Sequence, residues 1–500
     1  MIDNLSWVSV YPEILLLVMT CVIALVDIGV KSPLRGVTYA LTLLTLAGLT
    51  VLNGVYAADG KTVVALGGLV ISDPMGHWLK AFASLAMLVT LVYGRRYAGS
   101  RDMLRGGEFF TMALYALLGI YVMIGGYNFL VIYLGLELLT LTSYGLVALR
   151  RDDLKATEAA MKYFVLGALA SGFLLYGLSM LYGATGSLDL AEVVKAIAGG
   201  EATLKGSQQV LVLGVVFVVA GLAFKLGVVP FHMWVPDVYH GSPTAVTLMV
   251  GGAPKLAAFA IVVRLLAEGL QPMAVHWQQM LAVLAVVSLL VGNLAAIAQT
   301  NVKRMLAFST VAQMGFMLLA MVAGVNGTDT SNLGNAFGSG MFYVVTYVLT
   351  TLASFGVILL LSREGFESEE LTDLAGLNQR SPLYAAIMAM CMFSLAGVPP
   401  LVGFYAKLSV LQSLLASPDS FHVGLAVFAV LMSLVGAFYY LRVVKVMYFD
   451  APTQTAEIEG SMGARSLLTI NGALVLILGI VPGGLMALCA QAVSQIFAGA

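Results

Sequence analysis

The chain has 500 residues, of which 60% are hydrophobic and only 10% charged, and its formal net charge is −1. Its mean hydropathy is +0.96, whereas soluble domains carry about 25% charged residues. This composition predicts a polytopic helical membrane protein and gives no support to nucleic-acid binding. The three cysteines, Cys21, Cys391 and Cys489, lie far apart, without metal or redox spacing. The chain also carries no haem, flavin, iron–sulfur or nucleotide motif, so we expect no cofactor.

Apolar runs long enough to cross a bilayer recur along the whole chain. Because a membrane helix needs about 20 apolar residues, we predict an all-α fold with about fourteen spans. The first of them is retained, since no basic segment precedes it as in a signal peptide. The predicted spans lie at 12–30, 34–55, 75–94, 109–125, 127–149, 157–182, 208–230, 244–267, 277–298, 304–324, 336–361, 382–415, 422–448 and 465–495.

Two stretches between the spans have their own predicted structure. Residues 61–73 are too few to span, and the β-branched side chains around Gly67 and Gly68 predict a small surface hairpin. Residues 188–205 alternate acidic and basic side chains with apolar ones. We expect an interfacial helix and loop there.

Basic residues gather in alternate loops. The clusters are Lys31 and Arg35; Arg95, Arg96, Arg101 and Arg105; Arg150, Arg151 and Lys155; Lys303 and Arg304; Arg363 and Arg380; Arg442 and Lys445. By the positive-inside rule these loops face the cytoplasm, so both termini lie outside. We interpret Lys303, Arg304, Arg442 and Lys445 as anchors at the membrane surface. The charged loop 362–381 is interpreted as a solvated connector.

Two predicted spans are interrupted by prolines. One carries Lys225 shortly before Pro230, and the other holds Gly397-Val398-Pro399-Pro400 seven residues before Lys407. The two are five predicted spans apart, so they cross the membrane in opposite senses. Matched broken helices in two halves indicate an inverted-repeat transporter.

The predicted organisation follows from these breaks. It consists of an N-terminal three-helix segment, two inverted five-helix repeats that each form a half-channel and contain one broken helix, and a C-terminal helix. The boundaries are 1–108, 109–267, 277–448 and 449–500.

Four charged residues lie at membrane depth: Glu137, Lys225, Lys255 and Lys407. Each costs roughly 2.5–3.5 kcal/mol on insertion scales, so it must face protein or water. Desolvation lowers the pKa of a lysine and a nearby carboxylate raises it, which suits such groups to proton transfer. The alternative is that they are structural ion pairs or side chains that reach the membrane surface.

Two further residues are candidates for the same chemistry. His232 follows the first break, and its side chain has an unperturbed pKa near neutrality. A structural histidine that fixes the break is the other reading. Lys162 lies about one turn inside its span, from which it can also reach the cytoplasmic surface.

The stretch FHMWVPDVYHGSPT at 231–244 resembles the signature of the antiporter-like subunits of complex I and of the related Mrp cation/proton antiporters. The resemblance extends to Glu137, to Lys225 and Lys255 on either side of the signature, and to the motifs KRMLAFSTVAQMG at 303–315 and LAGVPPLVGFYAKL at 395–408. Within the family, PDVYHGSPT is more similar to the N subunits than to the PDAH form of the L and M subunits. Lys407 and the length of the chain, about fourteen spans, also resemble the N subunits. His240 departs from the acidic residue expected there.

The resemblance implies a function and a role for each site residue. It implies proton pumping driven by quinone reduction elsewhere in a respiratory complex, without a cofactor or NADH binding in this chain. Glu137 and Lys225 would form the ion pair of the first half-channel, with Lys162 as a modulating lysine beside Glu137. His232 would bridge Lys225 to Lys255.

In the same resemblance Lys255 would be the central relay lysine, and Lys407 would lead to the exit half-channel. The expected location is the bacterial inner membrane, with both termini periplasmic. The expected neighbours are an M-type subunit and the K and J side of the complex.

Two alternatives stay open at this point. One is an Mrp-type Na+/H+ antiporter subunit, which a stoichiometric sodium requirement would favour. The other is a membrane scaffold whose buried charges only hold helices together, which full pumping by Lys225→Met would favour.

Overall fold

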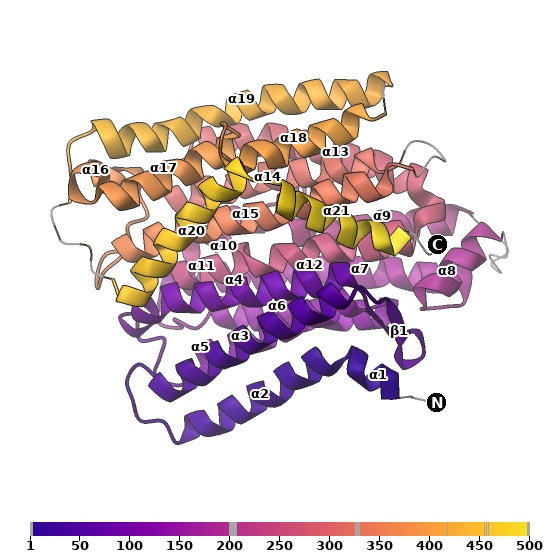
Figure 1. The fold of residues 1–500 in the computed structure, drawn as a ribbon, viewed down its shortest axis with the longest axis horizontal. Coiled ribbons are helices and arrows are strands. Elements are labelled where there is room, and N and C mark those ends of the chain that lie inside the picture. Colours follow the sequence, from indigo (N-terminus) through magenta and orange to yellow (C-terminus); the bar gives the residue numbers. More distant parts are fainter. Residues whose placement is uncertain are drawn as a thin grey trace.

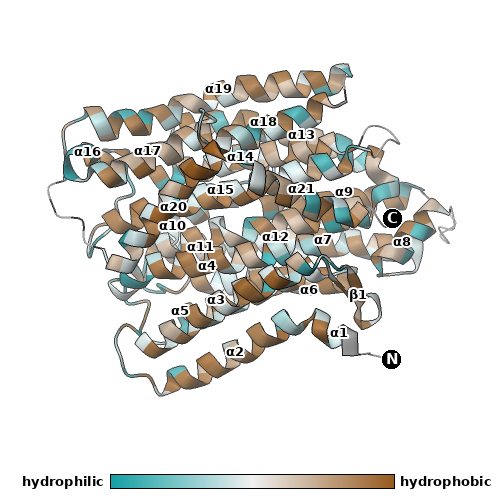
Figure 2. Cartoon of the chain, viewed as in Figure 1, coloured by the Kyte–Doolittle hydropathy of each residue, from teal (hydrophilic) through white to brown (hydrophobic). Residues whose placement is uncertain are grey.

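The protein is a bundle of long helices that run roughly side by side (Figure 1). The structure, a computed structural model, describes residues 4–199, 208–325, 331–417, 419–454, 456, 458 and 460–497. Hydrophobic residues follow the helices, whereas hydrophilic ones gather toward the two ends of the bundle (Figure 2). This distribution is the one expected for a protein whose middle lies in a bilayer.

The N-terminal segment contains three long helices and the predicted hairpin. Gly67 and Gly68 make the hairpin turn with φ of +68° and +92°, a region that favours glycine. The hairpin prediction is confirmed. The elements are α1 (Asn4–Ser9), α2 (Tyr11–Ile28), α3 (Gly36–Asp59), β1 (Val63–Ala65), η1 (Leu66–Gly68), β2 (Val70–Ser72) and α4 (Pro74–Gly99), and β1 and β2 pair antiparallel.

The middle of the chain holds the first broken helix. Asp189 caps α8 by accepting hydrogen bonds from the backbone of Ala191 and Glu192, so the prediction of a helix there is confirmed; residues 200–205 of that prediction lie outside the described residues. The elements are α5 (Glu108–Gly125), α6 (Phe129–Val147), α7 (Leu154–Thr185), α8 (Leu190–Ala198), α9 (Gln208–Leu226), α10 (Trp234–Gly241), α11 (Thr244–Gly251), α12 (Ala253–Val262), η2 (Val263–Glu268) and η3 (Gln271–Met273).

The last part of the chain holds the second broken helix. Helices α17 and α18 together occupy the predicted span 382–415. The elements are α13 (Ala274–Ile297), α14 (Val302–Ala323), α15 (Leu333–Leu361), η4 (Leu371–Leu374), α16 (Leu377–Arg380), α17 (Pro382–Ala396), α18 (Val402–Leu415), α19 (Ser420–Phe449), α20 (Met462–Ile480) and α21 (Gly483–Phe497).

The number of spans agrees with the sequence. Within the described residues, thirteen helical segments are long and apolar enough to cross a membrane. The shorter apolar helices α17 and α18 together occupy the remaining predicted span, 382–415. The predicted last span, 465–495, is divided into α20 and α21, because Pro482 follows the end of α20 and cannot continue its hydrogen-bond ladder.

The helices differ greatly in how much other helices cover them. The most apolar windows of α14, α15 and the span Thr244–Glu268 are 94% buried, whereas those of α2 and α19 are 28% buried. The core of the bundle is therefore built from the helices next to the two breaks. Helices α2 and α19 lie on its outside (Figure 1).

The basic loops meet at one end of the bundle, which we call the basic end. Arg35 donates to the backbone carbonyl of Arg105, and Arg95 to that of Leu34 at 3.1 Å. Helix α1 and the end of α21 lie together at the opposite end (Figure 1). The even number of crossings explains why the two termini share an end.

The loop 362–381 is not the solvated connector that its charge indicates. Glu367 accepts hydrogen bonds of 2.8 Å from Arg101 and Tyr97, and it lies 3.7 Å from Arg150. Burial by itself would raise the pKa of Glu367, but the hydrogen bond and charge of Arg101 outweigh it and hold this pKa below its ordinary value. Glu367 thus binds arginine side chains from other loops, because a partly buried guanidinium group needs hydrogen-bond acceptors.

Small residues allow α5 and α6 to pack closely. A Cβ added to Gly119 in α5 would lie 2.5 Å from the backbone nitrogen of Leu139 and 2.9 Å from the carbonyl oxygen of Gly135 in α6. Helix association in membranes relies on this kind of close backbone packing.

Gly119→Ala is therefore expected to force the two helices apart and to destabilise the protein by about 1–3 kcal/mol. The matched control is Gly48→Ala in α3, because no atom lies within 4 Å of a Cβ added there. The melting temperature of the purified protein measures the difference. Equal melting temperatures for the two variants would contradict close packing at Gly119.

Candidate functional site

The first break frees a backbone carbonyl inside the bundle. Helix α9 ends at Leu226 because Gly227 adopts φ +80°, and the backbone nitrogen of Val228 turns back to the carbonyl of Ala223 at 3.0 Å. The carbonyl of Leu226 then accepts a hydrogen bond of 2.8 Å from the ammonium of Lys255 on α12. Lys255 is almost completely buried, so the break supplies the acceptor that this charge needs.

The second break repeats this arrangement. Helix α17 ends at Ala396, Gly397 has φ +90°, and the backbone nitrogen of Val398 bonds to the carbonyl of Phe393 at 2.9 Å. The carbonyl of Ala396 accepts a hydrogen bond of 3.1 Å from Lys407 on α18. Both lysines thus bind the last carbonyl of a helix, where the helix dipole favours a positive charge.

Neighbouring side chains complete the two lysine sites. Lys407 also donates to the hydroxyl of Ser433 at 2.8 Å. An aromatic ring lies beside each ammonium: the ring of Trp234 is 5.6 Å from Lys255, and the ring of Phe316 is 4.9 Å from Lys407. Cation–π attraction at these distances adds to the stabilisation of the charge.

Lys225 and Glu137 do not form the expected direct ion pair. Lys225 donates to the hydroxyl of Thr140 at 3.2 Å, and Thr140 lies three residues after Glu137 on α6. Within the described residues no ion pair joins Lys225 to Glu137, and Oε1 of Glu137 is buried without a hydrogen-bond partner. The two charges remain close enough to interact electrostatically.

Lys162 pairs with residues other than Glu137. It lies 2.8 Å from Glu158 and 2.9 Å from Asp237, and Asp237 also binds Arg304 at 2.6 Å. These contacts therefore do not place Lys162 beside Glu137, where it was expected. Instead, Asp237 of the 231–244 stretch ties α7 to α14.

His232 is only partly buried and lies in the break between α9 and α10. Its ring centroid is 6.3 Å from that of Phe308, and Nδ1 has no hydrogen-bond partner among the described residues. The described part of the chain holds no hydrogen bond from His232 to Lys225 or Lys255. Within the described residues, His232 therefore does not join Lys225 to Lys255 by direct hydrogen bonds.

A polar cluster near Lys407 was missed in the sequence. Gln313 on α14 binds the hydroxyls of Tyr343 and Tyr440 and the carbonyl of Leu395. A small cavity of about 10 Å³ adjoins Gln313, Tyr343 and Lys407. The sequence did offer a signal for this cluster, because Gln313 is a polar residue within the predicted span 304–324.

Two buried ion clusters away from the lysines at the two breaks were also missed in the sequence. Lys80 on α4 is 2.6 Å from Glu13, and Arg264 is 2.7 Å from Asp73 and 2.6 Å from Glu268. Both cations stand within predicted spans, so the same reasoning that identified Lys225 applied to them. These pairs join α4 to α2 and to η2.

Comparison with known proteins gives a consistent picture. Residues 126–433 match the family described as NADH:quinone oxidoreductase/Mrp antiporter, TM. The NADH-quinone oxidoreductase subunit N of Polaromonas naphthalenivorans is 66% identical over 498 residues, 99% of either chain. That of Herminiimonas arsenicoxydans is 56% identical over 99% of this chain and 100% of its own.

The chain belongs to the subunit N branch of this family. Among solved structures, respiratory complex I from Thermus thermophilus with bound aureothin matches this subunit N with a TM-score of 0.78 and 34% identity, over 96% of this chain and 99% of the matched chain. The Mrp complex from Dietzia sp. matches with a TM-score of 0.84 but 21% identity, over 99% and 98%, and so shows the shared fold alone. The prediction of an N-type subunit is confirmed, and the Mrp-type alternative gains no support from it.

Proposed function

We propose that this subunit N moves protons across the bacterial inner membrane through its buried lysines, as a membrane subunit of NADH-quinone oxidoreductase driven by quinone reduction elsewhere in the complex. One observation carries the proposal. Lys255 and Lys407 each hold an ammonium on the last carbonyl of a broken helix. The proposal rests on the same resemblance that implies an M-type subunit and the K and J side as neighbours.

Repulsion between neighbouring lysines supports transfer from one to the next. Lys225 and Lys255 are both buried and interact electrostatically. Two ammonium groups in a low-dielectric interior repel each other, so protonation of one favours loss of the proton from the other. A proton that arrives at Lys225, near Glu137, thus favours transfer onward from Lys255 toward Lys407.

His232 and Lys162 have secondary roles in this proposal. The unpartnered Nδ1 of His232 is placed to accept a proton after a local movement of the break. Lys162 adjusts the first half indirectly, because its partner Asp237 lies just beyond the break. Neither residue needs to contact both relay lysines at once.

The repeat organisation is part of the same proposal. The N-terminal segment is 1–108, the inverted repeats are 109–267 and 277–448, and 449–500 completes the bundle. The two breaks share a positive-φ glycine directly after the helix end and a lysine on the last carbonyl. Equivalent breaks in the two halves are what an inverted repeat produces.

The basic end is proposed to face the cytoplasm, which places both termini in the periplasm. A cysteine replacing Arg105 at the basic end should react with a membrane-impermeant thiol reagent only from the cytoplasmic side. A cysteine replacing Gly199, after α8, should react only from the other side. Labelling in right-side-out and inverted vesicles measures this, in a background with exposed Cys21 replaced by serine; the reversed pattern would overturn the orientation.

Glu137→Ala is expected to reduce both proton pumping and NADH:quinone reductase activity strongly, because Lys225 loses the nearby carboxylate that favours its charged state. Glu137→Asp keeps the charge and loses only reach, so it should retain part of both. Pumping and reductase activity are measured in membrane vesicles and normalised to assembled complex. Near-normal rates in both variants would make Glu137 structural.

The Lys407→Arg variant tests whether Lys407 passes protons or is only a structural cation. Arginine keeps the positive charge that the carbonyl of Ala396 binds, but it holds its proton at every working pH. We expect normal assembly and poor pumping, with partial activity in Lys407→Glu because a carboxylate titrates. Proton uptake per NADH oxidised is the measurement. A fully active arginine variant, together with failed assembly of the glutamate variant, would favour the scaffold.

A further inference from the structure

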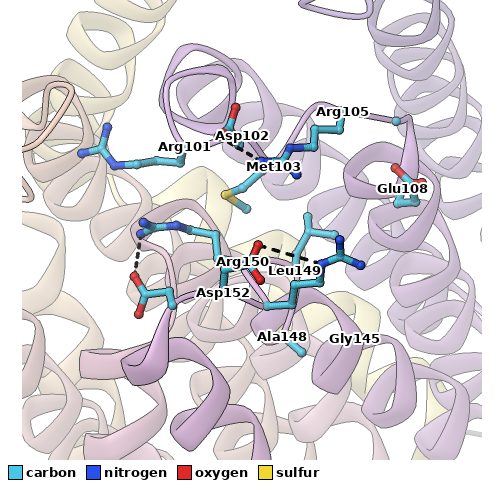
Figure 3. Close-up of a pocket in the computed structure, with 13 residues that line it drawn as sticks. Arg101, Asp102, Met103, Arg105, Glu108, Gly145, Ala148, Leu149, Arg150 and Asp152 are labelled. Atoms are coloured by element: carbon cyan, nitrogen blue, oxygen red, sulfur yellow. Dashed lines mark hydrogen bonds and ion pairs between the residues drawn. The ribbon is translucent and has the colours of Figure 1, made fainter.

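Two ion pairs line the open pocket at the basic end that is drawn in Figure 3. Arg105 lies 3.3 Å from Asp102, and Arg150 lies 3.1 Å from Asp153, so each pair joins residues three positions apart in one loop. Pairs that water reaches contribute little to stability. A different kind of ion pair lies toward the other end of the bundle, where α4 begins.

This second kind of pair is made by Arg264, which lies in η2 and is completely buried. Its guanidinium is 2.7 Å from the carboxylate of Asp73, which is only 1% exposed. It also donates to the carbonyl of Ile124 in α5 at 3.2 Å and to Glu268 in its own helical turn at 2.6 Å. A charge without access to water needs partners of this kind. The guanidinium therefore fixes η2 against α4 and α5.

The carboxylate of Asp73 is itself held in place. Its Oδ1 accepts a hydrogen bond of 2.7 Å from the backbone nitrogen of Gly76 and so caps α4. A Cβ added to Gly76 would lie 2.8 Å from that oxygen and 3.4 Å from Nη2 of Arg264, so the guanidinium packs directly on the first turn of α4. His77 in the same turn hydrogen-bonds with Asn53 on α3 at 3.0 Å. Asp73 is thus a fixed point for the contact with Arg264.

Arg264 stands in a π-helical turn that continues α12. In this turn the backbone nitrogen of Gly269 bonds to the carbonyl of Arg264, five residues earlier, at 2.9 Å. Such turns are rare and recur at functional sites. One additional residue in a turn rotates the helix on one side relative to the other by about 100°. The contacts of Arg264 hold this turn, and with it the rotation of α12.

The rotation of α12 matters because this helix carries Lys255, nine residues before Arg264. The ammonium of Lys255 donates to the carbonyl of Leu226 at 2.8 Å, and a separation of about 3.6 Å would no longer be a hydrogen bond. A small rotation or shift of α12 would therefore break this contact. Among the described residues, the charged group that interacts with Lys255 is Lys225 on α9, which lies apart from the ion pair of Arg264.

We propose that Arg264 and Asp73 form a clamp that positions Lys255 for proton transfer. The clamp holds η2 against the first turn of α4, and α12 carries this constraint to the carbonyl of Leu226. No proton passes through the clamp itself. The inference rests on the proposed function, because the position of Lys255 affects pumping only if Lys255 transfers protons. It gives the N-terminal segment 1–108 a role as the fixed support of that lysine.

Asp73→Asn tests the clamp and keeps the cap of α4, because the asparagine oxygen can still accept from the backbone nitrogen of Gly76. Its amide nitrogen is a donor and cannot bind a guanidinium. We expect Lys255 to bind its proton about tenfold less tightly once the carbonyl of Leu226 is out of reach, which moves the pH profile of pumping about one unit lower. Asp73→Glu restores a carboxylate and should recover part of this shift.

The matched control is Glu13→Gln, which breaks another buried ion pair of α4, that of Lys80 with Glu13 at 2.6 Å. This pair ties α4 to α2 instead of η2, so we expect an unchanged pH profile. If Asp73→Asn does not assemble, Gly76→Ala takes its place, since its Cβ would displace the carboxylate of Asp73 without removing a charge. Pumping is measured in membrane vesicles over a range of pH and normalised to assembled complex.

The outcomes separate the clamp from the proposed function. A lower pH profile in Asp73→Asn, with recovery in Asp73→Glu and a normal Glu13→Gln, supports the clamp. If Lys255→Arg pumps poorly but Asp73→Asn keeps the original profile, or loses rate without a shift, the clamp is wrong and the proposed function stands. An equal shift in Glu13→Gln would also overturn the clamp. If Lys255→Arg pumps normally, the proposed function fails, and the clamp fails with it.

Discussion

The hydrogen bond from a buried lysine to the last carbonyl of a broken helix is the interaction on which the rest of this structure depends. An ammonium inside a bilayer needs acceptors, and an intact helix offers none because its carbonyls are already bonded. Breaking α9 after Leu226 and α17 after Ala396 frees one carbonyl at each place, and Lys255 and Lys407 bind them. The glycines that follow have positive φ, which lets the chain turn back there.

The polar interior forms two regions around these bonds. On one side, Lys225 lies beside Thr140 and close to Glu137, and it is coupled to Lys255 by repulsion. On the other, Gln313 and its tyrosine partners surround the approach to Lys407. A protein that only needed to hold helices together would gain little from so many titratable and hydroxyl groups, since each costs free energy to bury.

Contacts between charged loops organise the basic end. The loop 362–381 brings carboxylates among basic side chains from several other loops, as the contacts of Glu367 and Arg101 illustrate. These ion pairs hold the loops of the basic end together.

The sequence by itself determined the spans, the hairpin at Gly67, the two breaks and the position of each lysine at membrane depth, because apolar run length, glycine, proline and buried charge are local signals. Only the tertiary structure decided the partners: Lys225 bonds to Thr140 rather than Glu137, Lys162 to Asp237, and Lys303 faces inward. Partner choice depends on how each helix is rotated against its neighbours. Beyond its first residues, a span such as α9 is apolar on every side apart from Lys225, so its sequence periodicity carries little information about that rotation.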